Sequence, residues 1–164
     1  MAQTNIYLKL EGIEGESVDE THQGWIELTQ FTWGVNTEAT FEVGQGGQAK
    51  QSHIHVIAAS KSCDKSTVVL WKNCTTGRHI PTGIISCMKL DGETRVEYLK
   101  IDLTDIMVKT VEWKGAAQDI LTEDIGLVFA EFKQTYTLQQ DLGGAGGAGG
   151  GREFGYNIQT SRAS

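Results

Sequence analysis

The chain has 164 residues, of which 14 are Lys or Arg and 21 are Asp or Glu, so its net charge at pH 7 is −7. An acidic surface repels phosphate backbones, and the composition therefore argues against nucleic-acid binding. The length suits one domain with a short extension, and no segment approaches the roughly 20 apolar residues that span a bilayer, so we expect no membrane insertion.

Two features bear on the compartment in which the protein works. The N-terminal stretch MAQTNIYLKLEGIEGES has neither a basic region nor a long apolar run, so we expect export, if it occurs, to need no cleaved signal peptide. The three cysteines, Cys63, Cys74 and Cys87, cannot all pair within the chain and lack zinc-like spacing, which favours folding in a reducing compartment.

Alternation of apolar and polar residues predicts β-strands along most of the chain, because successive side chains of a strand point to opposite faces. In chain order, the predicted strands cover residues 6–10, 25–33, 37–43, 52–57, 83–90, 93–103, 106–113 and 124–138.

A long hairpin arm is predicted at about residues 35–52. Its two strands flank a glycine-rich turn that can bend freely. The apolar residues near the turn cannot bury themselves against their own hairpin, so we expect the arm to lie on another subunit. The predicted contact residues are Phe41, Val43, Gly44, Gln45, Gly46, Gly47 and Gln48.

One helix is predicted, at about residues 64–77. Asp64 or Ser66 can cap its start, because each offers an oxygen to free backbone N–H groups. Gly77 and the following Pro81 predict its end. An apolar stripe at helical spacing is formed by Val68, Leu70, Trp71 and Cys74.

The C-terminal part begins with a glycine-rich segment. The run GGAGGAGGG at 143–151 predicts a flexible linker, and the segment 152–164 contains EFGYNI, which we expect to dock as a short strand. The remainder, residues 1–142, is predicted to be one domain. Its strands and single flanking helix predict a mainly β fold, either a compact β-barrel or two packed sheets, with the extended hairpin arm.

His53 and His55 raise the question of a metal site. Side chains at i and i+2 of a strand point the same way, and the spacing from Gly47 resembles the opening of the cupin metal motif. However, residues 58–60 hold no Glu at the place where that motif has one, and no His follows 81–83. We therefore expect outward-facing histidines, no metal, no cofactor and no catalytic residue. A small cupin-like metal-binding enzyme is the alternative function.

Four stretches together resemble the haemolysin-coregulated protein (Hcp) family of type VI secretion. They are GIEGESVDETHQGWIELTQFTWG, DKSTVVLWKNCTTGRHIP, VEYLKIDLTDIMVKTV and GYNIQ. The resemblance covers essentially the whole chain in the same order, and a more remote one extends to phage tail-tube subunits. It implies a homohexameric ring, rings stacked into a tube inside a sheath, a spike protein at the tip and small effector proteins carried in the lumen.

The same resemblance implies a location for the protein and for particular residues. It places the protein in the bacterial cytoplasm before firing and outside the cell afterwards, with no catalysis required. The arm from Val35 to Gln51 matches the extended loop of the family, which reaches the adjacent subunit and the next ring. Thr32 would face the lumen, with Phe31 and Trp33 packing away from it.

Overall fold

The computed structural model describes residues 4–44, 46–137 and 152–164, which form eleven strands and one helix. In chain order these are β1 (Thr4–Leu10), β2 (Ile26–Leu28), β3 (Gln30–Thr32), β4 (Val35–Glu42), β5 (Gly46–Ile54), β6 (Ile57–Ser62), α1 (Ser66–Thr76), β7 (His79–Asp91), β8 (Thr94–Lys114), β9 (Thr122–Tyr136), β10 (Arg152–Asn157) and β11 (Arg162–Ala163). The predicted linker at 143–151 lies outside the described residues.

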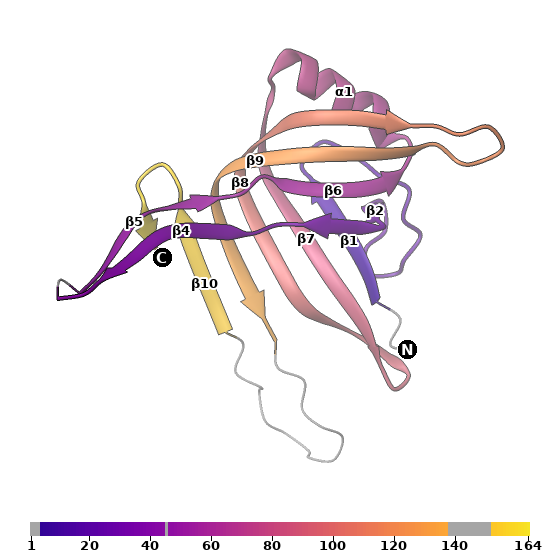
Figure 1. The fold of residues 1–164 in the computed structure, drawn as a ribbon. Coiled ribbons are helices and arrows are strands. Elements are labelled where there is room, and N and C mark those ends of the chain that lie inside the picture. Colours follow the sequence, from indigo (N-terminus) through magenta and orange to yellow (C-terminus); the bar gives the residue numbers. More distant parts are fainter. Residues whose placement is uncertain (1–3, 45, 138–151) are drawn as a thin grey trace.

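Nine of the strands form one strongly curved antiparallel sheet (Figure 1). Its hydrogen-bonded order is β11-β10-β9-β8-β7-β1-β2, with β6 on the remaining part of β9 and β3 on β6. β4 and β5 form a separate two-stranded sheet. The prediction of a mainly β fold with one helix is confirmed. Among the described residues no ladder joins β2 directly to β6, so the curved sheet is not a closed barrel.

The run 25–33, predicted as one strand, is two short strands with different partners. β2 pairs with β1, whereas β3 pairs with β6. Thr29 lies between them, and its backbone N–H donates to the carbonyl of Ser60 at 2.8 Å. The segment therefore crosses from one part of the curved sheet to the other, a change of partner that alternation along the chain does not report.

β8 is one continuous strand, whereas the sequence predicts two strands at 93–103 and 106–113. Asp105 has φ +53°, a conformation that Asp tolerates better than most residues. The ladder to β9 keeps its register across this position, with Thr104 opposite Glu131 and Ile106 opposite Phe129. Pairing on both edges thus carries one strand through a local irregularity.

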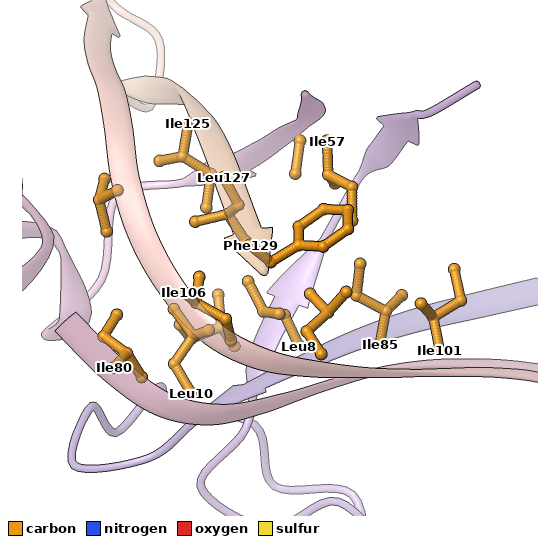
Figure 2. Close-up of a cluster of buried hydrophobic side chains, with 14 of the residues drawn as sticks. Leu8, Leu10, Ile57, Ile80, Ile85, Ile101, Ile106, Ile125, Leu127 and Phe129 are labelled. Carbon is orange, nitrogen blue, oxygen red and sulfur yellow. The ribbon is translucent and has the colours of Figure 1, made fainter. Parts of the chain in front are cut away.

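The core lies in the concave side of the curved sheet, where aliphatic side chains from several strands converge (Figure 2). Each fully buried aliphatic side chain stabilises the fold by about 1.5–3 kcal/mol. The labelled members are Leu8, Leu10, Ile57, Ile80, Ile85, Ile101, Ile106, Ile125, Leu127 and Phe129.

Helix α1 covers β8 with a face that is more polar than predicted. It ends at Gly77, whose φ of 64° is the left-handed conformation that suits glycine. At its start the Asp64 carboxylate accepts a hydrogen bond from the backbone N–H of Ser66 at 2.9 Å. Val68 and Trp71, predicted as part of the apolar stripe, are 72% and 42% exposed. The buried helix residues are Ser66, Thr67, Leu70 and Asn73.

A buried ion cluster explains why the start of the helix turns polar side chains inward. Lys61 and Glu123 are both 0% exposed, and their side chains approach to 3.3 Å. The Lys61 ammonium also lies 2.9 Å from the Asp64 carboxylate and 3.3 Å from the Thr67 hydroxyl. Buried charges must be paired and hydrogen-bonded. Asp64, just before α1, and Thr67, in its first turn, supply two of these partners.

Candidate functional site

The β4–β5 arm projects from the body of the molecule as a two-stranded ribbon (Figure 1). Its ladder runs from Val35 opposite Ile54 to Glu42 opposite Gly46, with an irregularity between Thr37 and Ala39. A two-stranded hairpin alone in water is marginally stable. This arm presents both of its edges and both of its faces to solvent along most of its length.

The tip of the arm exposes its largest apolar side chains. Phe41 is 88% exposed and Val43 is 106% exposed. The Phe41 ring covers the backbone of Gly47, its partner across the ladder, because a Cβ at Gly47 would lie only 2.6 Å from the ring. Gly44 and Gly46 have φ of +91° and +74°, which a tight turn requires and which glycine adopts without strain.

At the root of the arm, specific hydrogen bonds join the two chain segments that enter and leave it. The Trp33 indole N–H donates to the carbonyl of His55 at 3.1 Å, and the His55 N–H donates to the carbonyl of Gly34 at 2.9 Å. Farther out, the Gln51 amide donates to the Ser161 hydroxyl at 3.1 Å. Sequence reasoning missed this last contact, because nothing local signals that the C-terminal segment meets the arm.

The predicted contact residues all belong to this arm. Gln45 lies outside the described residues, whereas Gly44, Gly46, Gly47 and Gln48 are exposed along with the apolar pair at the tip. Thr32, on β3, is also exposed. Its neighbours Phe31 and Trp33 pack against the core cluster, as alternation along a strand requires.

His53 and His55 both lie exposed at the arm root, with ring centroids 5.6 Å apart. The described residues contain no group of three or more His, Cys, Asp or Glu side chains arranged to hold a metal ion. Residues 58–60, where a cupin would place its Glu, belong to β6 and pair with β9. The geometry thus brings the two imidazoles together without the further ligands of a cupin site.

Asp19, His22 and Ser86 form the arrangement that most resembles catalytic machinery. His22 Nδ1 lies 3.1 Å from the Asp19 carboxylate, and Nε2 lies 2.9 Å from the Ser86 hydroxyl. Ser86 is, however, 0% exposed, and its hydroxyl also donates to the Glu97 carboxylate. A nucleophile must reach its substrate, so this network serves to join the loop at Asp19 to β7 and β8.

Arg95 and Tyr7 complete this network. The Arg95 guanidinium donates to the second oxygen of Asp19, and the Tyr7 ring stacks on His22 with a centroid separation of 4.4 Å. Burial alone would raise the pKa of the Asp19 carboxyl, but hydrogen bonds from Thr21 and His22 and the Arg95 charge hold that pKa well below its ordinary value. The network is therefore built around an ionised carboxylate.

No helix of the described residues is long and apolar enough to cross a membrane. The candidate functional features are thus an exposed arm with an apolar tip, a histidine pair at its root and a buried polar network. Of these features, only the arm presents a large unpaired surface.

Comparisons with known proteins agree on one family. The family described as "Type VI secretion system effector, Hcp" matches residues 7–136. Protein hcp1 of Pseudomonas aeruginosa is 33% identical over 158 residues, which is 96% of each chain.

Solved structures show the same likeness. A structure described as a type six secretion system protein is 27% identical, covers 99% of this chain and 100% of its own, and superposes with a TM-score of 0.90. Hcp1 from Salmonella typhimurium is 28% identical with full coverage of both chains and a TM-score of 0.79. The chain belongs to the Hcp family of type VI secretion proteins.

Proposed function

We propose that this protein is the structural subunit of a type VI secretion inner tube. Six copies close into a ring, rings stack inside a sheath, and a spike protein stands at the tip. The tube assembles in the bacterial cytoplasm and is then secreted, and it carries small effector proteins in its lumen. Membership of the Hcp family supports this function, and no step in it requires catalysis by the chain.

The single observation that carries the proposal is the exposed arm. A ribbon with Phe41 and Val43 almost fully exposed presents apolar surface and two unpaired edges, which soluble proteins normally cover. A second copy of the chain can cover them through a heterologous contact, and repetition of such a contact closes a ring. Obligate interfaces of this kind commonly bury about 2,000 Å² or more.

Light scattering coupled to size-exclusion chromatography tests the ring directly. We expect a mass six times that of one chain, and ring-shaped particles in negative-stain images of the same fractions. A folded species with the mass of a single chain at high concentration would contradict the proposal.

Thr32 is proposed to face the lumen, because it is the exposed residue between two side chains that pack against the core. Thr32→Gln should leave the hexamer intact and weaken the retention of a co-purified effector, since a longer polar side chain changes the lumen wall. The measurement is the amount of effector that co-elutes with the ring. Unchanged retention would remove Thr32 from the lumen surface.

A further inference from the structure

One face at the root of the arm gathers three side chains with metal-binding atoms. Asn36 on β4 is directly opposite His53 on β5, so their side chains lie on the same face of the ribbon. His55 follows two residues after His53 and continues this face. All three side chains are exposed, and neither the ring nor the tube proposed above assigns them a role.

The distances among these side chains suit one small cation. A metal bound by two imidazoles at about 2.0–2.1 Å places their ring centres about 5.2 Å apart at a tetrahedral angle. The two rings are already 5.6 Å apart. His55 Nε2 lies 2.7 Å from the Asn36 amide oxygen, which is a hydrogen-bond distance. An ion bound here replaces the Nε2 proton, and the two atoms are then close enough together to be neighbouring ligands of one metal.

The backbone under the site is fixed before any ion arrives. The N–H and the carbonyl of His55 are both engaged, with Gly34 and with the Trp33 indole respectively. A Cβ at position 34 would lie 3.2 Å from His55 Nδ1, so the glycine leaves room for the imidazole. Ligands held by such a frame lose less conformational freedom on binding a metal than ligands on a free loop.

We propose that Asn36, His53 and His55 form a binding site for a divalent transition-metal cation of the Ni²⁺, Cu²⁺ or Zn²⁺ class. Imidazole nitrogens suit these ions, and the amide oxygen provides a third, weaker donor. Water completes the coordination, so the ion is exchangeable. Because Asn36 lies on β4 and both histidines lie on or directly after β5, a bound ion cross-links the two strands where the arm leaves the body.

Calorimetric titration of the untagged full chain with Ni²⁺ tests the site. We expect one ion per chain, with Kd rising about 100-fold in His53→Ala and in His55→Ala, because losing one imidazole leaves only one imidazole and the weaker amide oxygen as ligands. The matched control is His79→Ala, since His79 is the other exposed histidine and pairs with Asp105 at 2.5 Å. That variant should bind Ni²⁺ like the parent chain.

A gain-of-affinity variant makes the test independent of loss by misfolding. Asn36→Asp replaces the neutral oxygen with a carboxylate and should tighten Ni²⁺ binding about tenfold, because a charged oxygen is a stronger ligand for a divalent cation. Ni²⁺ binding that is absent, or that is the same in both single histidine variants as in the parent chain, would overturn the proposal. So would an Asn36→Asp variant that binds no tighter.

Discussion

At the scale of single residues, the buried network around His22 resembles a catalytic triad that no substrate can reach. Its distances are those of a hydrolase triad, yet Ser86 is fully enclosed and is shared with Glu97. The sequence shows only separate residues here, because Asp19, His22 and Ser86 come from a loop and a distant strand. Their meeting depends on β1 pairing with β7, which no local pattern encodes.

Asp19 gives a pH prediction with a definite sign. Its pKa in the folded protein is below its ordinary value of 3.8, so the carboxylate stabilises the fold fully above that value. This stabilisation is lost as the pH falls through the unfolded pKa toward the folded one. Asp19→Asn should therefore lower the free energy of unfolding at pH 7 by about 1–3 kcal/mol and flatten its decline on acidification.

Urea unfolding at a series of pH values from about 7 to 2 measures this effect. Asp102→Asn is the control, because Asp102 is 38% exposed and lies 3.5 Å from its partner Lys100. The control should keep the stability and the acid slope of the parent chain. An Asp19→Asn variant with an unchanged acid slope would show that the network does not depend on the ionised carboxylate.

At the scale of elements, features set by nearby residues in the sequence were predictable, whereas features set by residues distant in the sequence were not. The end of α1 at Gly77 follows from the conformation that glycine alone adopts easily. The face of α1 that packs does not follow from its apolar stripe, because Lys61 and Glu123 beneath it need polar partners. A hydropathy pattern does not show that Lys61 is buried, so the sequence predicts an apolar packing face for α1 where the structure has a more polar one.

The arm was predictable for a related reason. Its alternation, glycine turn and lack of a self-made core are all local, so the observed ribbon, Val35–Ile54, lies close to the predicted range of about 35–52. Its second strand, β5, begins at Gly46, earlier than the predicted strand 52–57. What the arm contacts is not encoded locally. The contact from Gln51 to Ser161 illustrates this, because it joins residues more than a hundred positions apart in the chain.

Val43 provides a test of the arm with a closely matched control. Val43→Ser should leave the stability of the single subunit unchanged, because the side chain is 106% exposed, but it should weaken association between subunits or rings. Val18→Ser removes the same side chain from a loop position that is 89% exposed. Sedimentation velocity should show a shift to smaller species for Val43→Ser alone, and equal profiles would exclude the tip as a contact.

At the scale of the whole molecule, the net negative charge opposes association between copies of the chain. Six copies of a chain with net charge −7 would carry −42, so the stacking proposed above requires basic residues of one ring face to meet acidic residues of the next. Contacts of that kind are screened as the Debye length falls from about 10 Å at 0.1 M salt to about 3 Å at 1 M. Apolar contacts of the kind proposed within the ring would not be weakened in this way.

We therefore expect stacked tubes to shorten or dissociate as NaCl rises to about 1 M, while hexameric rings persist. Negative-stain imaging and sedimentation velocity across a salt series measure the two species separately. Tubes whose length is independent of ionic strength would show that stacking is not mainly electrostatic. Rings that dissociate together with the tubes would show that both contacts share one mechanism.

The long central pair of strands has a mechanical consequence. β8 and β9 run through both halves of the curved sheet, and their ladder extends from Leu99 opposite Tyr136 to Lys114 opposite Thr122. Tension applied along these strands would load many hydrogen bonds simultaneously in shear, whereas a peeling force would break them one after another. In the tube proposed above, subunits loaded in the first way would resist stretching as stiff bodies.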